Sequence, residues 1–336
     1  MPYKIITDFD KIDENKWSKF LLNSPYTTPF QTSDFFLFFN ETPNCRADLF
    51  VILEEDKIQS SCIVTIQKEK GIKALFSKRA IIYGGPIFIN ENPKAATALL
   101  EYVYNYLKRE VIYIEVRNLK DYAIFTSMFL DEKWKYIPYL NVQLFFENKD
   151  KDELLSGMKY NRRREIKLSI KEGAYSSEAK NIKEVEELYV ILNDLYQTKV
   201  KLPLPDADYF FKLFKSDIGK VFVVKHNETI IGGSFCIYYP DLMIYTLYYC
   251  GVRDYHKKIF PTHLAILAAI DFGIKNGLRG IDLMGAGQPN EEYGVRNYKA
   301  EFGGDMVEHG RFIKICNPFL FQLGKIGLAV LKKIKK

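Results

Sequence analysis

Short apolar runs separated by polar turns dominate residues 219–316, and their order predicts a meander of antiparallel strands followed by a helix. The expected strands are rich in β-branched and aromatic residues and span 221–225, 229–239 and 242–251. Pro261 opens an apolar segment at 262–276 that Gly277 closes, and proline at the start with glycine just past the end is typical of a helix. Two further strands are expected at 280–284 and 308–315.

The first half of the chain repeats this order with weaker signals. Strands are expected at 49–53, 61–67 and 80–83, then a helix opened by Pro93 at 94–110, then strands at 111–116 and 141–146. The halves share negligible sequence identity, so the repeat is one of element order and predicts two α/β domains with mixed sheets and similar topology. The expected boundaries are 1–150 for the first domain, 151–175 for a connecting basic helix, 176–316 for the second domain and 317–336 for a basic amphipathic C-terminal helix.

The connecting helix carries one arginine on its apolar face. That face is marked by Leu155, Met158, Ile166 and Ile170. Arg162 lies in its middle, where a guanidinium is costly unless an anion meets it. Either an internal carboxylate pairs with Arg162, or the side chain points into an interdomain cleft and holds a ligand. Arg163, Lys167 and Lys171 form a separate stripe that is most simply a solvated face.

Composition and cysteine usage narrow the class of protein. A chain of 336 residues with 47% apolar and 27% charged residues predicts two packed domains rather than disorder. Its five cysteines are scattered without a C-x-x-C pair, and its four histidines form no H-E-x-x-H motif, so we expect neither disulfides nor a metal site. The first residues lack a basic region followed by an apolar run, and we expect a cytoplasmic protein.

Positive charge is concentrated after residue 150. Residues 1–150 hold 19 Lys and Arg against 20 Asp and Glu, whereas the remainder holds 29 against 22. An anionic partner is therefore expected on the second half, such as a phosphate, a nucleotide, an RNA or a lipid head group. Residues 317–336 carry five lysines and no acidic residue. This tail either lies on the inner face of a membrane as a peripheral contact or docks on its own domain with the lysines outward.

Several motifs resemble a known family. They are Pro29-Phe30-Gln31-Thr32, Tyr83-Gly84-Gly85-Pro86, Met158 to Gly173, Tyr248 to Leu264, Ile281 to Ala286, and Val295 to Gly303, which reads VRNYKAEFG. The element order of each half resembles the GNAT acetyltransferase fold, and the tandem order resembles the Fem-type (FemAB) aminoacyltransferases and the BioF-like acetyltransferases. The resemblance implies two tandem GNAT-like, acyl-CoA N-acyltransferase-like domains. It implies transfer of an acetyl or aminoacyl group to an amino group of a cell-envelope, peptidoglycan or polysaccharide precursor. The acceptor would be a small molecule or lipid-linked, and no cofactor would be bound tightly.

The same resemblance places the reacting centre in the second half. The lysine of the family's K-x-x-F-G segment corresponds to Lys299, which could supply positive charge to a tetrahedral intermediate. Tyr298 or Tyr293 could supply a proton to the leaving group, and Asp282 could orient the amine or cap the following turn. The alternative is that residues 293–299 form an ordinary polar loop. The residues expected to bind the acceptor are Arg162, Arg163, Tyr248 and Tyr293.

The donor loop departs from the GNAT pattern. Where that fold has a glycine-rich loop, residues 253–261 contain no glycine. We expect donor contacts from Arg253, Tyr255, Lys257 and Lys258 together with the start of the following helix. Acyl-CoA and aminoacyl-tRNA both remain open as co-substrate, the latter making tRNA a partner.

A rival hypothesis is a non-catalytic RNA- or membrane-surface-binding module that uses the basic half. An RNA module usually interleaves aromatic and basic residues on strands, which the strongest basic run here does not do. The sequence therefore favours the enzyme.

Overall fold

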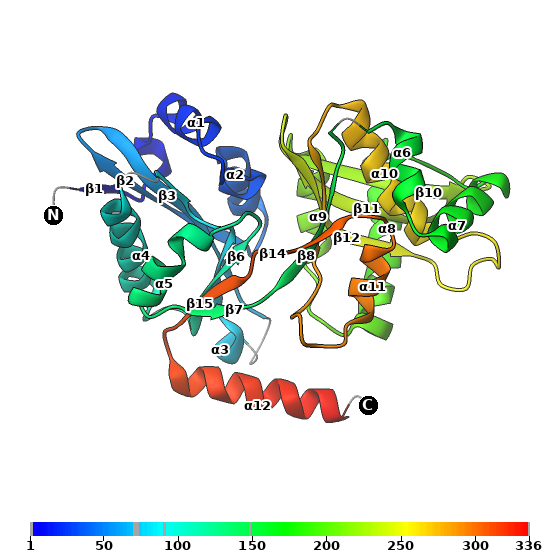
Figure 1. The fold of residues 1–336 in the computed structure, drawn as a ribbon. Helices are drawn as coiled ribbons and strands as arrows, with labels where there is room; N and C mark the ends of the chain where they lie inside the picture. The colour runs from blue at the N-terminus through cyan, green and yellow to red at the C-terminus, as the bar shows by residue number, and fades with distance from the viewer. Residues whose placement is uncertain (1–2, 70–73, 90–91, 148, 335–336) are drawn as a thin grey trace. The chain divides into compact units, whose positions relative to one another are not determined.

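The computed structural model describes residues 3–69, 74–89, 92–147 and 149–334, which form two compact units (Figure 1). The first unit comprises Met1–Pro138 with His309–Lys336, and the second comprises Tyr139–Glu308. Both are mixed α/β units, as the sequence predicts.

The first unit is built on one mixed sheet. Its strand order is β1 (Lys4–Ile6), β2 (Arg46–Glu54), β3 (Lys57–Gln67), β4 (Arg79–Gly84), β6 (Tyr113–Asn118), β15 (Arg311–Ile315) and β7 (Lys135–Ile137), and β5 (Ile87–Phe88) pairs with β3. Its helices are α1 (Glu14–Leu22), α2 (Ser33–Glu41), α3 (Ala74–Ser77), α4 (Pro93–Leu107), α5 (Thr126–Asp131) and α12 (Pro318–Ile334), with short 3₁₀ turns at Phe9–Lys11, Pro29–Gln31 and Ala123–Phe125.

The second unit has the same plan. Its strand order is β9 (Tyr175–Glu178), β10 (Gly219–His226), β11 (Thr229–Tyr238), β12 (Met243–Gly251), β13 (Gly280–Gly285), β8 (Leu140–Phe145) and β14 (Asp305–Glu308). Its helices are α6 (Lys151–Gly157), α7 (Tyr160–Lys171), α8 (Ile182–Leu195), α9 (Ala207–Lys215), α10 (Pro261–Lys275) and α11 (Gly294–Ala300), with a π-helical turn at Tyr196–Val200.

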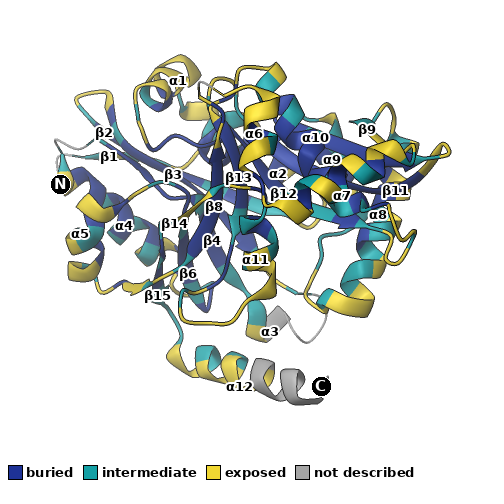
Figure 2. Cartoon of the chain, turned by 45° about the vertical axis from the view of Figure 1, so that its right-hand side comes forward, coloured by how far each residue is buried: buried dark blue, intermediate teal, exposed yellow. Residues whose placement is uncertain are grey.

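Helices cover both faces of the second sheet. On β11 the backbone of Gly233 lies against Leu188 of α8, whereas the hydroxyl of the next residue, Ser234, donates to the Ala265 carbonyl of α10 at 3.0 Å. Successive strand residues point to opposite faces, so α8 and α10 lie on opposite sides. The resulting core is dark blue in Figure 2, and α10 contributes much of it.

Two strands are exchanged between the halves of the sequence. In each sheet, the strand next to the last one comes from the other half: β8 lies between β13 and β14, and β15 lies between β6 and β7. The unit boundaries therefore fall at Pro138 and Glu308 and differ from the expected 150 and 316. The expected final strand at 308–315 is two strands, β14 and β15, in different sheets.

Local sequence explains the turns and helix starts. The hairpins β2–β3 and β10–β11 turn on Glu55-Asp56 and on Asn227-Glu228, all at positive φ, as tight two-residue hairpin turns require. Pro93 and Pro261 are the first residues of α4 and α10, as predicted.

The connecting segment is two helices rather than one. Met158 is extended and ends α6, and α7 begins at Tyr160. Met158 and Ile166 are buried as predicted, but Ile170 is 52% exposed, so the apolar face ends before it.

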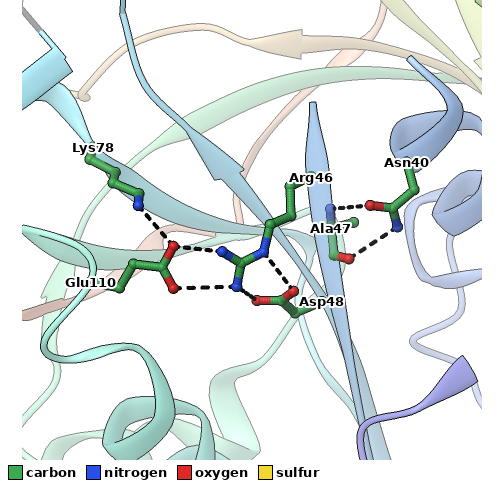
Figure 3. Close-up of polar contacts among 6 residues, drawn as sticks. All are labelled: Asn40, Arg46, Ala47, Asp48, Lys78 and Glu110. Carbon is green, nitrogen blue, oxygen red and sulfur yellow. Dashed lines mark hydrogen bonds and ion pairs between the residues drawn. The ribbon is translucent and has the colours of Figure 1, made fainter. Parts of the chain in front are cut away.

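An ion-pair network ties β2 to the start of β4 and the end of α4 (Figure 3). Arg46 donates to Asp48 at 2.9 Å and to Glu110 at 2.6 Å, and Lys78 donates to the same Glu110 carboxylate at 2.8 Å. These side chains are partly exposed, so we assign the network a modest structural role.

Candidate active site

The parallel strand pair separates early in the second unit. β12 and β13 are paired at Met243–Gly280, Ile244–Ile281 and Tyr245–Asp282. Beyond this, β12 continues to Gly251 and β13 to Gly285 without pairing with each other. In the middle of the sheet, the facing backbone N–H and C=O groups of these two strands are therefore not bonded to each other and can bind a ligand.

The corresponding pair of the first unit stays closed. β4 and β6 are paired over five positions, to Gly84–Asn118 at the end of both strands. The ring of Tyr122, 1% exposed, lies beside this end, and its hydroxyl donates to the Pro86 carbonyl at 2.6 Å. Gly85 has φ of 84°, and a Cβ there would lie 2.5 Å from the Tyr122 ring. The first unit therefore lacks the separation seen in the second.

Both separated strands are irregular at this point. The register of β12 against β11 passes from Thr246 to Tyr248, so Leu247 is the extra residue of a bulge. On β13, Asp282 faces Gln143 of β8 and Gly285 faces Asn141. The two β13 residues between them therefore lie opposite a single residue of β8. Met284 in this second bulge has φ of 62°, a conformation that is costly for such a side chain and that recurs at functional sites.

Lys299 of α11 reaches the end of β13. Its side chain is 5% exposed, and Nζ donates to the carbonyls of Met284 at 3.2 Å and Gly285 at 2.9 Å. Nζ also lies 6.0 Å from the ring centroid of Tyr249 on β12. Burial lowers the pKa of Lys299 to about 8, and the Asp282 carboxylate acts in the opposite direction. The sequence left open whether 293–299 is a loop, and the structure shows a helix from Gly294.

Asp282 is held away from solvent. Its carboxylate accepts from the side-chain amides of Asn141 at 3.1 Å and Gln143 at 2.9 Å and from the Met284 N–H at 2.6 Å. With an exposed fraction of 0%, it cannot orient an amine directly. Of the two predicted roles, capping the following turn is the one that the contacts support.

Tyr298 belongs to a chain of polar groups that joins three helices. Its hydroxyl lies 3.3 Å from Nδ1 of His263 on α10. Nε2 of His263 contacts Nη1 of Arg162 on α7 and lies 3.0 Å from Glu165 of the same helix. Burial raises the pKa of Tyr298 well above its ordinary value of 10, so the phenol keeps its proton at neutral pH.

The tautomer of His263 sets where the Tyr298 proton points. Burial and then Arg162 lower the pKa of His263 to about 3, so the ring is neutral at neutral pH. Arg162 can only donate, so when it bonds to Nε2 the ring proton lies on Nδ1 and donates to the phenol oxygen. In that tautomer the hydroxyl proton of Tyr298 is available to another acceptor. In the other tautomer Nε2–H donates to Glu165, and Nδ1 accepts the phenol proton.

Arg162 has the internal carboxylate that the sequence left as one of two alternatives. Its guanidinium donates to Glu301 at 2.6 Å and lies 4.3 Å from the ring centroid of Tyr298 and 4.7 Å from that of Phe302. The side chain is 3% exposed, so Arg162 acts on the site through these contacts. Gly303 has φ of 84° and lies against the Gly157 carbonyl, which explains the glycine of the VRNYKAEFG motif.

The residues expected to bind the donor lie in the turn before α10. Arg253 and Lys257 are exposed. Lys258 is also exposed but pairs with Glu172 at 3.2 Å, and the Tyr255 hydroxyl lies 2.8 Å from Nδ1 of His226. The two side chains in the best position to meet an anionic donor are therefore Arg253 and Lys257.

The residues expected to bind the acceptor come from different elements of the second unit. Arg163 donates to the Ser156 carbonyl at 2.8 Å, at the end of α6. Tyr248 packs edge-on against Tyr196 and Phe210. Tyr293 is 40% exposed just before α11.

Sequence reasoning missed several residues of this site. His263 belongs to no sequence motif, and its place in the first turn of α10 sets it against α7. Tyr249 stacks on Tyr298 with ring centroids 6.0 Å apart. Arg296 donates to the Ala286 carbonyl at 2.9 Å and to the Pro289 carbonyl at 3.1 Å, which fixes the loop between β13 and α11.

Solved structures share this architecture although no protein-family model and no curated protein matches the chain. FemX superposes with a TM-score of 0.70 at 14% identity, over 95% of this chain and 99% of FemX. A tandem GNAT protein from the clavulanic acid biosynthesis pathway gives 0.62 at 9% identity, over 94% and 99%. L-PGS from Bacillus licheniformis gives 0.57 at 12% identity, over 93% and 96%. The chain therefore shares the fold of FemX and of the tandem GNAT protein.

Proposed function

We propose that the protein is an N-acyltransferase whose reaction takes place in the second unit, where β12 and β13 separate. The observation that carries the proposal is the buried Lys299 ammonium at the end of β13. A cation is costly in a desolvated position unless it meets developing negative charge, and acyl transfer develops such charge on the carbonyl oxygen.

Each of these residues has a separate role in the proposed reaction. The acceptor amine attacks the acyl carbonyl, a C–N bond forms, and the C–S or C–O bond to the donor breaks. The ammonium of Lys299 stabilises the tetrahedral oxyanion, and Tyr298 gives its proton to the departing thiolate or alkoxide. The proton lost by the amine passes to solvent, from which Tyr298 is reprotonated. His263 and Arg162 are positioning residues, because they act through Tyr298.

The proposed donor is acyl-CoA or aminoacyl-tRNA, and the proposed acceptor is an amino group of a cell-envelope, peptidoglycan or polysaccharide precursor. The fold shared with the tandem GNAT protein, a structure named as being without AcCoA, supports acyl-CoA as the donor. The exposed cations Arg253 and Lys257 suit the phosphates that both donors carry.

A direct assay tests the proposal. The purified protein is incubated with acetyl-CoA or charged tRNA and an amine-bearing nucleotide-linked peptide or sugar, and amide formation is followed by mass spectrometry. Lys299→Met should lower turnover by about 10²- to 10³-fold. Lys275→Met replaces an exposed lysine at the end of α10 and should leave turnover unchanged. Equal turnover in both variants would remove Lys299 from the reaction.

A further inference from the structure

The C-terminal helix α12 is fixed to the first unit along one face. The N–H groups of Cys316 and Asn317 both donate to the Ile112 carbonyl at 2.9 Å, and the Asn317 side chain caps the helix at Leu320 N at 3.0 Å. The ring of Phe321 meets Tyr113 edge-on at 5.4 Å. These contacts set which side of α12 faces outward.

The outward side carries an apolar stripe. Phe319 is 73% exposed, Leu323 is 38% exposed and Ile326 is 59% exposed. Their spacing of four and three residues places them on one face of the helix, away from Phe321. The exposed residues appear in yellow along the first turns of α12 in Figure 2. Large apolar side chains gathered on one helix face are typical of an interaction surface.

The positive charge of residues 317–336 indicates which kind of partner the stripe would bind. Residues 317–336 contain Lys325, Lys332, Lys333, Lys335 and Lys336 and no Asp or Glu. An apolar stripe on a lysine-rich helix suits an interface that offers both hydrocarbon and negative charge. A second copy of the chain suits it less, because two tails with five positive charges each would repel.

We propose that α12 docks the protein on the surface of an anionic membrane, with Phe319, Leu323 and Ile326 inserted at the boundary of head groups and acyl chains and the positive charge of the lysine-rich tail attracted to the lipid phosphates. The helix lies in the plane of the surface; in the part of the chain that the structure describes, no helix is long and apolar enough to cross a bilayer. This inference is independent of the proposed acyl transfer.

Vesicle flotation of the full chain tests the docking. The native protein should float with vesicles of phosphatidylcholine and phosphatidylglycerol and remain unbound with phosphatidylcholine alone. The triple variant Phe319→Gln, Leu323→Gln, Ile326→Gln should bind at least about tenfold more weakly. A second triple variant, Lys325→Gln, Lys332→Gln, Lys333→Gln, should lose the preference for anionic vesicles.

A matched control separates the stripe from general surface apolarity. Leu22, Ile124 and Leu130 are 70%, 64% and 50% exposed elsewhere on the first unit. Changing these three to Gln should leave flotation unchanged, and circular dichroism should show that every variant is folded. Failure of the native protein to float with anionic vesicles would overturn the proposal. A native dimer that the stripe variant converts to a monomer, with no flotation of either, would also overturn it and assign the face to self-association.

Discussion

Replacement of Lys299 by Met changes a buried charge into an apolar side chain of similar length. The pKa of Lys299 falls from 10.5 to about 8 on folding, which corresponds to about 3 kcal/mol at about 1.36 kcal/mol per pH unit. At pH 7 the native protein holds this ammonium in a poorly solvated place. The variant is freed of that cost but leaves the Met284 and Gly285 carbonyls without their donor, at about 1–3 kcal/mol. The two effects nearly cancel at neutral pH.

The pH dependence of the free energy of unfolding separates the cost of the buried charge from the loss of its hydrogen bonds. Between pH 8 and 10.5 the unfolded chain holds a proton on Lys299 that the folded protein has released, so the free energy of unfolding rises with pH. The native protein should gain about 2 kcal/mol relative to Lys299→Met between pH 8 and 9.5.

Urea unfolding of both proteins at pH 7.5, 8.5 and 9.5 measures how the stability difference between them changes with pH. Other titrating groups contribute equally to both proteins and cancel. A constant stability difference between the two proteins over this range would refute the shifted pKa. A loss above about 3 kcal/mol in the variant at pH 7.5 would make Lys299 a structural residue rather than a strained functional one.

Three further changes should act locally. His263→Gln removes a ring that stays neutral in the folded protein down to about pH 3 but takes up a proton near pH 6.5 in the unfolded chain. The free energy of unfolding of the native protein therefore falls as the pH drops below 6.5. In urea unfolding, the native protein should lose about 2 kcal/mol more than the variant between pH 7 and 5. Tyr122→Phe removes the donor to the buried Pro86 carbonyl and should cost about 1–3 kcal/mol in the same assay without changing acyl transfer. Glu110→Gln breaks the pairs with Arg46 and Lys78; because these side chains are partly exposed, the loss should be about 1 kcal/mol or less, and a larger loss in thermal or urea unfolding would contradict the modest role of the network.

The sequence predicted those features that local chemistry determines. Proline and glycine marked the limits of α10, and polar pairs marked the hairpin turns. Each signal lies within a few residues of the structure that it predicts, because helix caps and tight turns depend on local backbone conformation.

Pairings over long sequence distances could not be predicted in the same way. Asn141 and Gln143 meet Asp282 across about 140 residues, and this pairing depends on the exchange of β8 into the second sheet. Arg162 and His263 are 101 residues apart and meet only because α7 packs on α10. A single histidine in an apolar helix gives no sign of such a partner.

The most direct test of the central claim is the rate of acyl transfer by the native protein and by Lys299→Met from pH 6.5 to 9.5, with one donor and acceptor. If the Lys299 ammonium stabilises the oxyanion, the ratio of native to variant rates is at least about 10² below pH 8 and falls as the ammonium loses its proton above pH 8. A ratio near one at every pH, or a large ratio that does not change with pH, would contradict that role.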